Sequence, residues 1–271
     1  MIKIGVVGIA GRMGSLIAKG VIDTNDMSLA GALEMKGHAF VGKNSGYALG
    51  TESQEIEVCS DMNDAFCACD VIIDFTMPEV TMETLEYAVN AGKALVIGTT
   101  GLDDEQVAGI KDASSDIPLV LAPNMSIGVN VMFKVAGILT RLLGDAYDIE
   151  IIEAHHRLKK DAPSGTALGL ARSIAESREV DLAEHACYER HGIIGARPDG
   201  QIGIQTLRAG DIVGDHTVLF AGNGERVEIT HRAHSRQNFA QGAIKAARWL
   251  HGKKSGFYTM MDVLGLEDED R

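Results

Sequence analysis

The chain has 271 residues, of which 45% are hydrophobic, and this predicts one large or two modest globular domains with a substantial buried core. Its formal net charge of −13 at pH 7 argues against a general nucleic-acid binder, although a local basic pocket for a small anion stays compatible with it. Four cysteines without a CxxC pair favour reduced thiols in a cytoplasmic protein, and no apolar run approaches the ~20 residues of a membrane span, so we expect no membrane partner.

The first half of the chain alternates short apolar runs with segments of helical spacing. Continuous apolar strands are predicted at Ile2–Val7 and Met27–Leu33, and later at 71–75, 94–98 and 118–122. Helices are predicted between them at Arg12–Ile22, Pro78–Ala91 and Asp103–Asp112. Fully apolar strands separated by helices indicate a parallel sheet covered on both faces, and such sheets bind ligands beyond the carboxyl ends of their strands.

The second half has a different pattern, in which polar and apolar residues alternate along the strands. Helices are predicted at 128–143, 165–176 and 237–250, the last of them packing back on the first domain. Strands are predicted at 147–154, 201–207, 211–221 and 226–234, with a hairpin at Gly222-Asn223-Gly224. The predicted fold is α/β. A Rossmann-like parallel-sheet domain at 1–126 and 236–271 is joined to a smaller α+β domain with a mixed, open sheet at 127–235. The acidic end at 266–271 is expected to be solvated.

A glycine-rich turn follows the first strand. Gly8, Gly11 and Gly14 have the spacing GxxGxxG rather than GxGxxG, which still allows a tight turn and close approach of the backbone to a pyrophosphate. Glu34 lies about twenty residues later, at the end of the second strand, where a carboxylate can accept hydrogen bonds from a ribose. The alternatives are a small-residue turn and a surface carboxylate. Together the two features favour a dinucleotide site.

The residues after the second strand bear on which dinucleotide binds. The carboxylate of Glu34 should repel the 2′-phosphate of NADP, and Met35 carries no charge to attract it, although Lys36 could reach it. The sequence therefore predicts that NADH serves at least as well as NADPH.

A strongly basic loop at 153–167 is the second candidate site. His155 and His156 end a strand, Arg157, Lys159 and Lys160 follow, and Ser164 is a good N-cap for a helix that begins with Gly165 and Thr166. The helix N–H groups, the Thr166 hydroxyl and the helix dipole would bind a carboxylate, with His155 and Lys159 as candidate proton-transfer groups. For any single residue a solvated loop with an ordinary N-cap is the simpler explanation, but the combination favours a site. The other histidines lack ligand spacing, and no metal site is predicted.

Six segments together resemble the 4-hydroxy-tetrahydrodipicolinate reductase (dihydrodipicolinate reductase) family of the diaminopimelate route to lysine. They lie at 8–14, 74–76, 98–101, 122–130, 153–167 and 231–243. The resemblance implies NADH or NADPH as cofactor, a small dicarboxylate substrate, and hydride delivery to ring carbon 4 with loss of water. It makes His155 and Lys159 the catalytic pair and assigns substrate carboxylates to His156, Gly165 and Thr166. It places the cofactor on Gly8, Ile9, Ala10, Gly11, Arg12, Met13, Glu34, Gly98, Thr99, Thr100, Ala122, Pro123, Asn124 and Met125.

The resemblance also implies a homotetramer formed through the sheet of the second domain, and domain closure about hinges near residues 127 and 236. Many relatives carry arginine directly after the acidic residue, whereas this chain has Met35, which puts NADP contact there in doubt. Two competing functions stay open from the residues alone: another two-domain dehydrogenase, and a sensor that binds NADH without turnover. The basic loop discriminates against both, since neither needs the His155–Lys159 pair.

Overall fold

The computed structural model describes residues 1–51 and 55–267, and the chain divides into two compact units. Unit 1 comprises residues 1–127 and 236–271, and unit 2 comprises residues 128–235. Residues 268–271 of the acidic end, which was expected to be solvated, lie outside the described residues.

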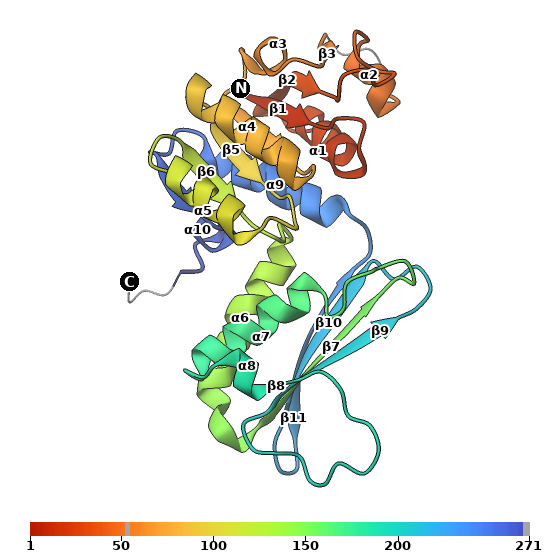
Figure 1. Cartoon of the computed structure of the whole chain (residues 1–271), viewed down its shortest axis with the longest axis vertical. Coiled ribbons are helices and arrows are strands. Elements are labelled where there is room, and N and C mark those ends of the chain that lie inside the picture. The colour runs from red at the N-terminus through yellow and green to blue at the C-terminus, as the bar shows by residue number, and fades with distance from the viewer. Residues whose placement is uncertain (52–54, 268–271) are drawn as a thin grey trace. The chain divides into compact units, whose positions relative to one another are not determined.

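Unit 1 is built on a parallel sheet (Figure 1). Its seven described strands run in the order β12-β6-β5-β4-β1-β2-β3. Their bounds are β1 Ile2–Val7, β2 Met27–Leu33, β3 Val58–Cys59, β4 Val71–Asp74, β5 Ala94–Ile97, β6 Pro118–Leu121 and β12 Gly256–Tyr258. The strand order reverses direction beside β1, between its neighbours β4 and β2. Ligands bind at this kind of switch point in open α/β sheets, so the loops after β1 and β4 are placed for a cofactor.

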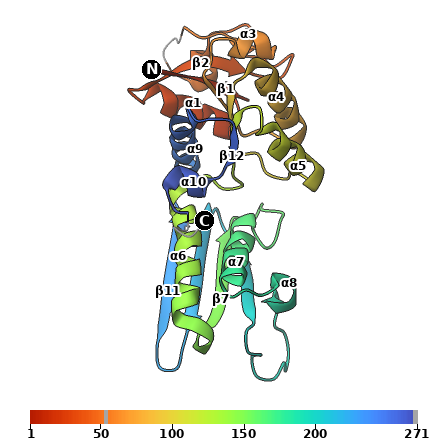
Figure 2. The same ribbon diagram turned by 90° about the vertical axis from the view of Figure 1, so that its left-hand side faces the viewer.

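Helices cover both faces of this sheet, as Figure 2 shows with α1 and α9 on one side and α4 and α5 on the other. The helix bounds are α1 Arg12–Ile22, α2 Ser45–Leu49, α3 Met62–Phe66, α4 Pro78–Ala91, α5 Asp104–Ala113, α9 Gln237–Leu250 and α10 Met260–Leu264. Each face of the sheet has its own hydrophobic core. The core on the side of α1 and α9 contains Ile17, Val21 and Ile244, and the core on the side of α4 and α5 contains Leu85 and Ile110. Each fully buried side chain of this size stabilises the fold by about 1.5–3 kcal/mol.

Unit 2 is a mixed sheet with its two long helices on one face (Figure 1). The described strands run in the order β11-β10-β7-β9-β8, with β10 antiparallel to β7 and β11, and β9 parallel to β7 and β8. Their bounds are β7 Asp148–His155, β8 Ala186–Cys187, β9 Ile202–Arg208, β10 Gly214–Ala221 and β11 Arg226–Ala233. The helices are α6 Ile127–Leu143, α7 Gly165–Ser177 and α8 Leu182–His185, with a 3-10 turn at Gly144–Ala146.

Side chains of β7 alternate between the two faces. Ile149 and Ile151 are buried under α6 and α7, and Glu153 and His155 continue the same buried face. Glu150 and Ile152 point to the opposite face, where Ile152 is 39% exposed and Leu207 of β9 is 48% exposed. A strand period of two therefore puts one glutamate beside the buried histidine and another on the open face.

The predicted fold class is confirmed, and the differences are local. The strand expected at 211–221 begins only at Gly214, since residues 211–213 form the turn after β9. Short elements such as α2, β3 and β12 were not predicted, because two to five residues carry too little periodicity. We expected no apolar run to approach the length of a membrane span. This was wrong for the helical stretch 127–146, whose 20 residues are long and apolar enough by length and composition alone. That helix packs Met132 and Ala136 into the core of unit 2.

Candidate functional site

The glycine turn after β1 forms a tight backbone cradle. Gly8 has a φ of +66°, and its carbonyl accepts a hydrogen bond of 2.9 Å from the N–H of Gly11. A Cβ at position 14 would lie 2.0 Å from the carbonyl oxygen of Gly8. These residues must therefore be glycine, because the turn needs a positive φ and the first turn of α1 lies directly against it.

The N-terminus of α1 is open. Its N-cap is Gly11, and among the described residues no side chain caps the helix and no acid lies in its first turn. The Ala10 N–H donates to Oε1 of Glu34 at 2.7 Å, which fixes the carboxylate at the end of β2 beside the glycine turn. Uncapped helix N–H groups and a nearby acceptor for ribose hydroxyls are the donor set that a dinucleotide needs, so the residues present fit this cofactor.

A buried aspartate organises the loops after β4 and β5. Oδ1 of Asp74 accepts from the N–H and the hydroxyl of Thr76, at 2.9 and 2.6 Å. Thr99 also accepts from the Thr76 N–H at 3.1 Å and from the Thr81 hydroxyl at 2.7 Å. Burial raises the pKa of Asp74, and the threonine hydrogen bonds oppose that rise only in part. Thr99 is thereby held at the sheet edge, with Thr100 exposed beside it.

The loop after β6 is fixed by α9. Ala122 and Met125 are buried, Pro123 is exposed, and Asn124 accepts from the Ser126 N–H at 2.9 Å. A Cβ on Gly242 of α9 would lie 1.7 Å from the carbonyl oxygen of Met125, so the helix packs directly on this backbone. Since β1, β4, β5 and β6 are parallel, all the cofactor residues implied by the resemblance lie at the carboxyl edge of one sheet.

The second site is centred on the end of β7 in unit 2. His155 is 8% exposed, and its Nδ1 lies 2.6 Å from Oε2 of the fully buried Glu153. Arg208 of β9 binds the same carboxylate with two parallel hydrogen bonds of 2.8 and 2.9 Å. Burial raises the pKa of Glu153, but the hydrogen bonds from Arg208, His155 and the Ser164 N–H outweigh it and hold the pKa below its usual value. Glu153 is therefore an anion in a buried network.

Two neighbouring histidines are held neutral by burial. Burial lowers the pKa of His155, and the Glu153 carboxylate offsets only part of this effect. His216 of β10 packs edge-to-face on His155, with ring centroids 5.1 Å apart. Burial, with a contribution from His155, lowers the pKa of His216 to about 3.

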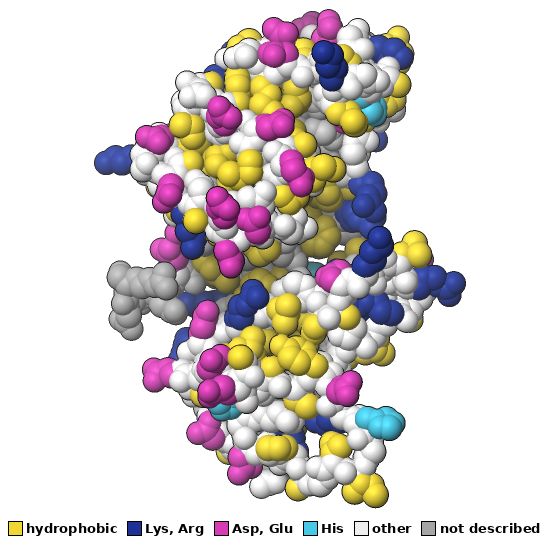
Figure 3. All heavy atoms as spheres, viewed as in Figure 1, with side chains coloured by type: hydrophobic (Ala, Val, Ile, Leu, Met, Phe, Trp, Pro, Cys, Tyr) yellow, Lys and Arg dark blue, Asp and Glu magenta, His cyan; other side chains and the backbone are white. Residues whose placement is uncertain are grey.

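The loop after β7 presents its cations outward. Lys159 is half-buried and pairs with Asp161 at 2.9 Å, while Arg157 and Lys160 are exposed. His156 accepts from the Leu158 N–H at 3.2 Å, which shapes the turn. Figure 3 shows Lys and Arg side chains gathered at the end of the mixed sheet that carries the loops after β7 and β9. This end is a local cationic surface on an acidic chain.

The helix α7 begins at the end of the same loop. Ser164 is its N-cap and accepts from the Ala167 N–H at 3.2 Å, and the Ser164 Oγ lies 3.0 Å from Nε2 of His216. Gly165 is exposed, and in the part of the chain that the structure describes no atom outside its chain neighbours and the backbone of α7 lies within 4 Å of where its Cβ would be. Space is thus left at the first helical residues, where a carboxylate would meet N–H groups and the positive end of the helix dipole.

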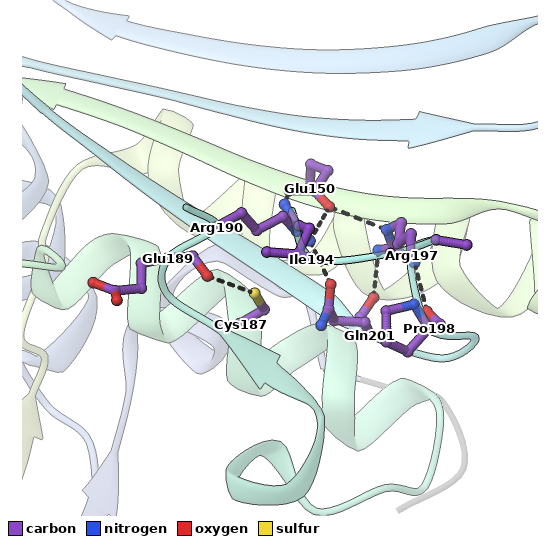
Figure 4. A pocket seen from close by; sticks show the side chains of 10 residues that line it. Glu150, Cys187, Glu189, Arg190, Ile194, Arg197, Pro198 and Gln201 are labelled. Carbon is purple, nitrogen blue, oxygen red and sulfur yellow. Dashed lines mark hydrogen bonds and ion pairs between the residues drawn. The ribbon is translucent and has the colours of Figure 1, made fainter. Parts of the chain in front are cut away.

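A hollow of about 500 Å³ lies elsewhere in unit 2, at the loop 187–201 (Figure 4). Glu150 there accepts two hydrogen bonds from Arg190, of 2.9 and 2.7 Å, and one of 3.2 Å from Arg197. These arginines are already paired with a carboxylate, so the network holds the loop on the open face of the sheet. The hollow shares no lining residue with the basic loop.

The structure places His155, His156 and Lys159 at the end of β7 and in the loop that leads to Gly165 and Thr166, the first residues of α7, and it groups the implied cofactor residues in unit 1. Among residues 1–51 and 55–267, no group of three or more His, Cys, Asp or Glu side chains could hold a metal ion. The site residues predicted from the sequence do not include Glu153, Arg208, Asp161 or Asp74. The i, i+2 spacing of Glu153 and His155 on a strand was a usable signal, but Arg208 required the register of β9.

Two family descriptions match the chain: "Dihydrodipicolinate reductase, N-terminus" over residues 2–125 and "Dihydrodipicolinate reductase, C-terminus" over residues 128–264. A 4-hydroxy-tetrahydrodipicolinate reductase of Desulfotalea psychrophila is 52% identical over 268 residues, which are 99% of this chain and 100% of that protein. The protein of the same name from Hahella chejuensis is 50% identical over 267 residues, which are 98% of this chain and 100% of the relative.

Solved structures show the same likeness. A dipicolinate-bound dihydrodipicolinate reductase from Paenisporosarcina sp. TG-14 is 28% identical, with a TM-score of 0.77, covering 97% of this chain and 98% of that one. An amine dehydrogenase from Mycobacterium smegmatis is 11% identical with a TM-score of 0.59, covers 96% of this chain and 95% of that one, and shares the fold alone.

Proposed function

The chain belongs to the dihydrodipicolinate reductase family, and we propose that its basic loop and glycine turn carry out the chemistry of that family. The chain catalyses the NAD(P)H-dependent reduction, with loss of water, of 4-hydroxy-tetrahydrodipicolinate to tetrahydrodipicolinate in lysine biosynthesis. The observation that carries the assignment of the site is that the charge of Lys159 acts on the buried His155, whose partner Glu153 also binds the N–H of Ser164, the N-cap of α7.

The cofactor is assigned to unit 1, which is a nucleotide-binding Rossmann domain. The nicotinamide, when bound, supplies the hydride. Gly8 to Met13 would hold the pyrophosphate with backbone N–H groups, and Glu34 would accept from ribose hydroxyls. Gly98, Thr99 and Thr100 and the segment Ala122 to Met125 would position the remainder at the sheet edge. The open N-cap of α1 supports this assignment.

The substrate carboxylates are assigned to unit 2. Gly165 and Thr166 would bind one carboxylate through helix N–H groups and a hydroxyl, and His156 would bind the other. The exposed Arg157 and Lys160 add positive potential that attracts a dianion. The dipicolinate bound to the Paenisporosarcina relative is a planar dicarboxylate of the same class.

Lys159 and His155 are assigned to the proton-transfer step. The substrate loses its 4-hydroxyl as water, ring carbon 4 gains a hydride, and one proton completes the reduction, so the product has one oxygen atom fewer. We assign that proton to the ammonium group of Lys159. The cationic loop would stabilise the negative charge that develops as the hydride arrives.

The cofactor preference follows from the residues after β2. Glu34 repels a 2′-phosphate, and the exposed Met35 provides no compensating charge, so NADH is expected to serve at least as well as NADPH. A twentyfold preference for NADPH in kcat/KM would contradict this.

We further propose a cytoplasmic homotetramer that acts without nucleic acid or membrane partners. The four unpaired thiols and the apolar side chains of Ile152 and Leu207 on the open sheet face support this. A monomeric peak in light scattering at micromolar concentration would overturn the tetramer.

The test of function follows NADH and NADPH oxidation at 340 nm with substrate made in situ by the preceding aldol-type synthase. Turnover that depends on both synthase and reductase is expected. The sensor hypothesis would replace the reductase if a folded protein bound NADH, measured by fluorescence, and oxidised neither cofactor.

A further inference from the structure

We infer that Glu153 and Arg208 are positioning residues for the reaction, and that they hold His155 with its proton on Nδ1 so that Nε2 is a hydrogen-bond acceptor. This inference rests on the proposed function for the part that His155 plays. It assigns a role to a carboxylate–arginine pair that the proposed function does not use.

The register of the sheet places these three side chains together. Glu153 and His155 lie two residues apart on β7 and so share its buried face. In the parallel pairing of β7 with β9, His155 lies beside Arg208 and Glu153 lies beside Thr206. Strand order and register therefore bring an arginine to a carboxylate that is 55 residues away in the sequence.

The hydrogen bonds to Glu153 determine the direction of its contact with His155. Oε1 accepts from the Ser164 N–H at 3.0 Å, from the Thr206 hydroxyl at 3.2 Å and from Arg208 at 2.9 Å. Oε2 accepts from Arg208 at 2.8 Å and lies 2.6 Å from Nδ1 of His155. An ionised carboxylate only accepts hydrogen bonds, so Nδ1 must be the donor.

Arg208 keeps this direction fixed. Its bidentate pairing stabilises the carboxylate as an anion, and the same guanidinium donates to the carbonyl oxygen of Asp161 at 2.6 Å. The network thus fastens the loop that carries Lys159 as well as the histidine. A protonated Glu153 would lose the acceptor that His155 requires.

The remaining ring nitrogen of His155 faces space kept open by a glycine. A Cβ on Gly214 would lie 3.0 Å from Nε2, so a larger residue there would press on that atom. The groups that face the ring are Glu153 from β7, Arg208 from β9, His216 from β10, and Lys159 from the loop. Among these the neutral His155 is an acceptor through Nε2, which leaves the ammonium of Lys159 as the proton donor.

The first test is Glu153→Gln in the full chain. Its amide can accept from Ser164 and Thr206 but has no second oxygen for Nδ1, so kcat should fall about 10- to 100-fold, with KM for the substrate changing less. The Glu153 anion raises the pKa of His155, so its loss should move the acid limb of the kcat/KM profile to lower pH. A purely structural role would lower the amplitude and leave the limb in place.

A matched control lies on the opposite face of the same strand. Glu150 is also bound by arginines but does not contact His155, so Glu150→Gln should leave kcat within about twofold and the limb unmoved. Glu153→Gln with wild-type kcat and limb, beside an impaired His155→Gln, would overturn the inference and leave the proposed function intact.

Arg208 should act on His155 through Glu153, and its hydrogen bond to the Asp161 carbonyl should contribute less to the rate. Arg208→Met removes the cation that keeps the carboxylate ionised, so activity should be lost on the acid side at a higher pH than in the wild type. The double variant Glu153→Gln, Arg208→Met should lose at most about threefold more in kcat than Glu153→Gln alone, because only the hydrogen bond to the Asp161 carbonyl is left to remove. Multiplied effects would show that Arg208 works independently and would overturn its assignment.

A measurement on the wild type covers the case in which these variants do not fold. With 15N-labelled histidine, and His155→Gln to assign the resonances, Nδ1 of His155 should be the protonated nitrogen at neutral pH. Protonation of Nε2 would overturn the inference. Failure of the proposed function would be separate and would show as a wild type that does not oxidise NADH or NADPH with the substrate.

Discussion

The N-termini of α1 and α7 both follow a strand and a loop, but they are built in opposite ways. The first helical turn of α1 has the glycine N-cap Gly11 and no side-chain cap among the described residues, whereas α7 is capped by Ser164. The glycine turn lets the protein backbone come close to a large ligand, so a ligand there would be bound by backbone N–H groups. The capped helix leaves fewer N–H groups, and its neighbours are ionisable side chains. A bare N-terminus therefore suits phosphate binding, and a capped one beside a cationic loop suits carboxylate binding with proton transfer.

The largest expected effect tests the chemical half of this comparison. Lys159→Ala should lower kcat on the order of 10²-fold or more, because it removes the proposed general acid. Lys160→Ala is the matched control, since Lys160 is the exposed neighbour in the same loop, and its kcat should stay within about threefold. Steady-state oxidation of NADH at 340 nm measures both. A near wild-type kcat for Lys159→Ala would remove this lysine from the mechanism.

The bare N-terminus is tested by Gly14→Ala. The added Cβ would lie 2.0 Å from the Gly8 carbonyl oxygen, so the turn must move. We expect the unfolding free energy to fall by about 1–3 kcal/mol and the Kd for the cofactor to rise about tenfold. The KM for the substrate should change little. Gly109→Ala in α5 is the control, because its nearest neighbour is Met82 at 3.6 Å, and alanine there should stabilise the helix by about 0.5–1 kcal/mol. Urea unfolding and fluorescence titration with NADH would decide the matter, and an unchanged Kd for Gly14→Ala would contradict the cradle.

The capped N-terminus predicts a pH-dependent stability. His216 contacts the cap residue Ser164 and stays neutral, because burial and His155 lower its pKa to about 3. An unfolded histidine titrates near 6.5, so between these values the unfolded chain binds one more proton and stability falls as pH falls. From pH 7 to pH 5 His216 should account for about 2 kcal/mol of that loss. Urea unfolding at pH 7 and pH 5 measures this loss, and it should be smaller by that amount in His216→Gln. An equal fall in unfolding free energy in the variant and the wild type would show that His216 is protonated in the fold.

The two sites also differ in how far the sequence could predict them. Gly8, Gly11, Gly14 and Glu34 follow one strand–turn–helix–strand unit, so local spacing was sufficient to predict a dinucleotide site. His155, Lys159 and Ser164 were predicted in the same way, from the residues of one loop. Glu153 lay in the same segment but was not predicted, because its proposed role depends on Arg208, and the pairing of β7 with β9 is a tertiary property. The pairing of Lys159 with Asp161 likewise needed the geometry of the turn.

The same distinction explains the fold. Long apolar strands such as Ile2–Val7 and amphipathic helices such as Gln237–Leu250 carry their own periodicity and were predicted with the bounds observed. The strand β12, Gly256–Tyr258, has three residues and exists because β6 offers it an edge. Propensity alone could not have indicated it, since short strands are set by their partners.

The smallest expected effect sharpens the phosphate side of the comparison. Met35 is 73% exposed, and its N–H donates to Oε2 of Glu34 at 3.3 Å, so a side chain there begins beside the proposed ribose site. Met35→Arg would supply the guanidinium that many relatives carry, and an exposed ion pair of about 1 kcal/mol corresponds to a roughly fivefold rise in the NADPH-to-NADH ratio of kcat/KM. Met35→Gln is the uncharged control and should leave the ratio unchanged, and Lys36→Ala should lower it if Lys36 contacts the phosphate in the wild type. An unchanged ratio in Met35→Arg would mean that Glu34 decides the cofactor preference without help from its neighbour.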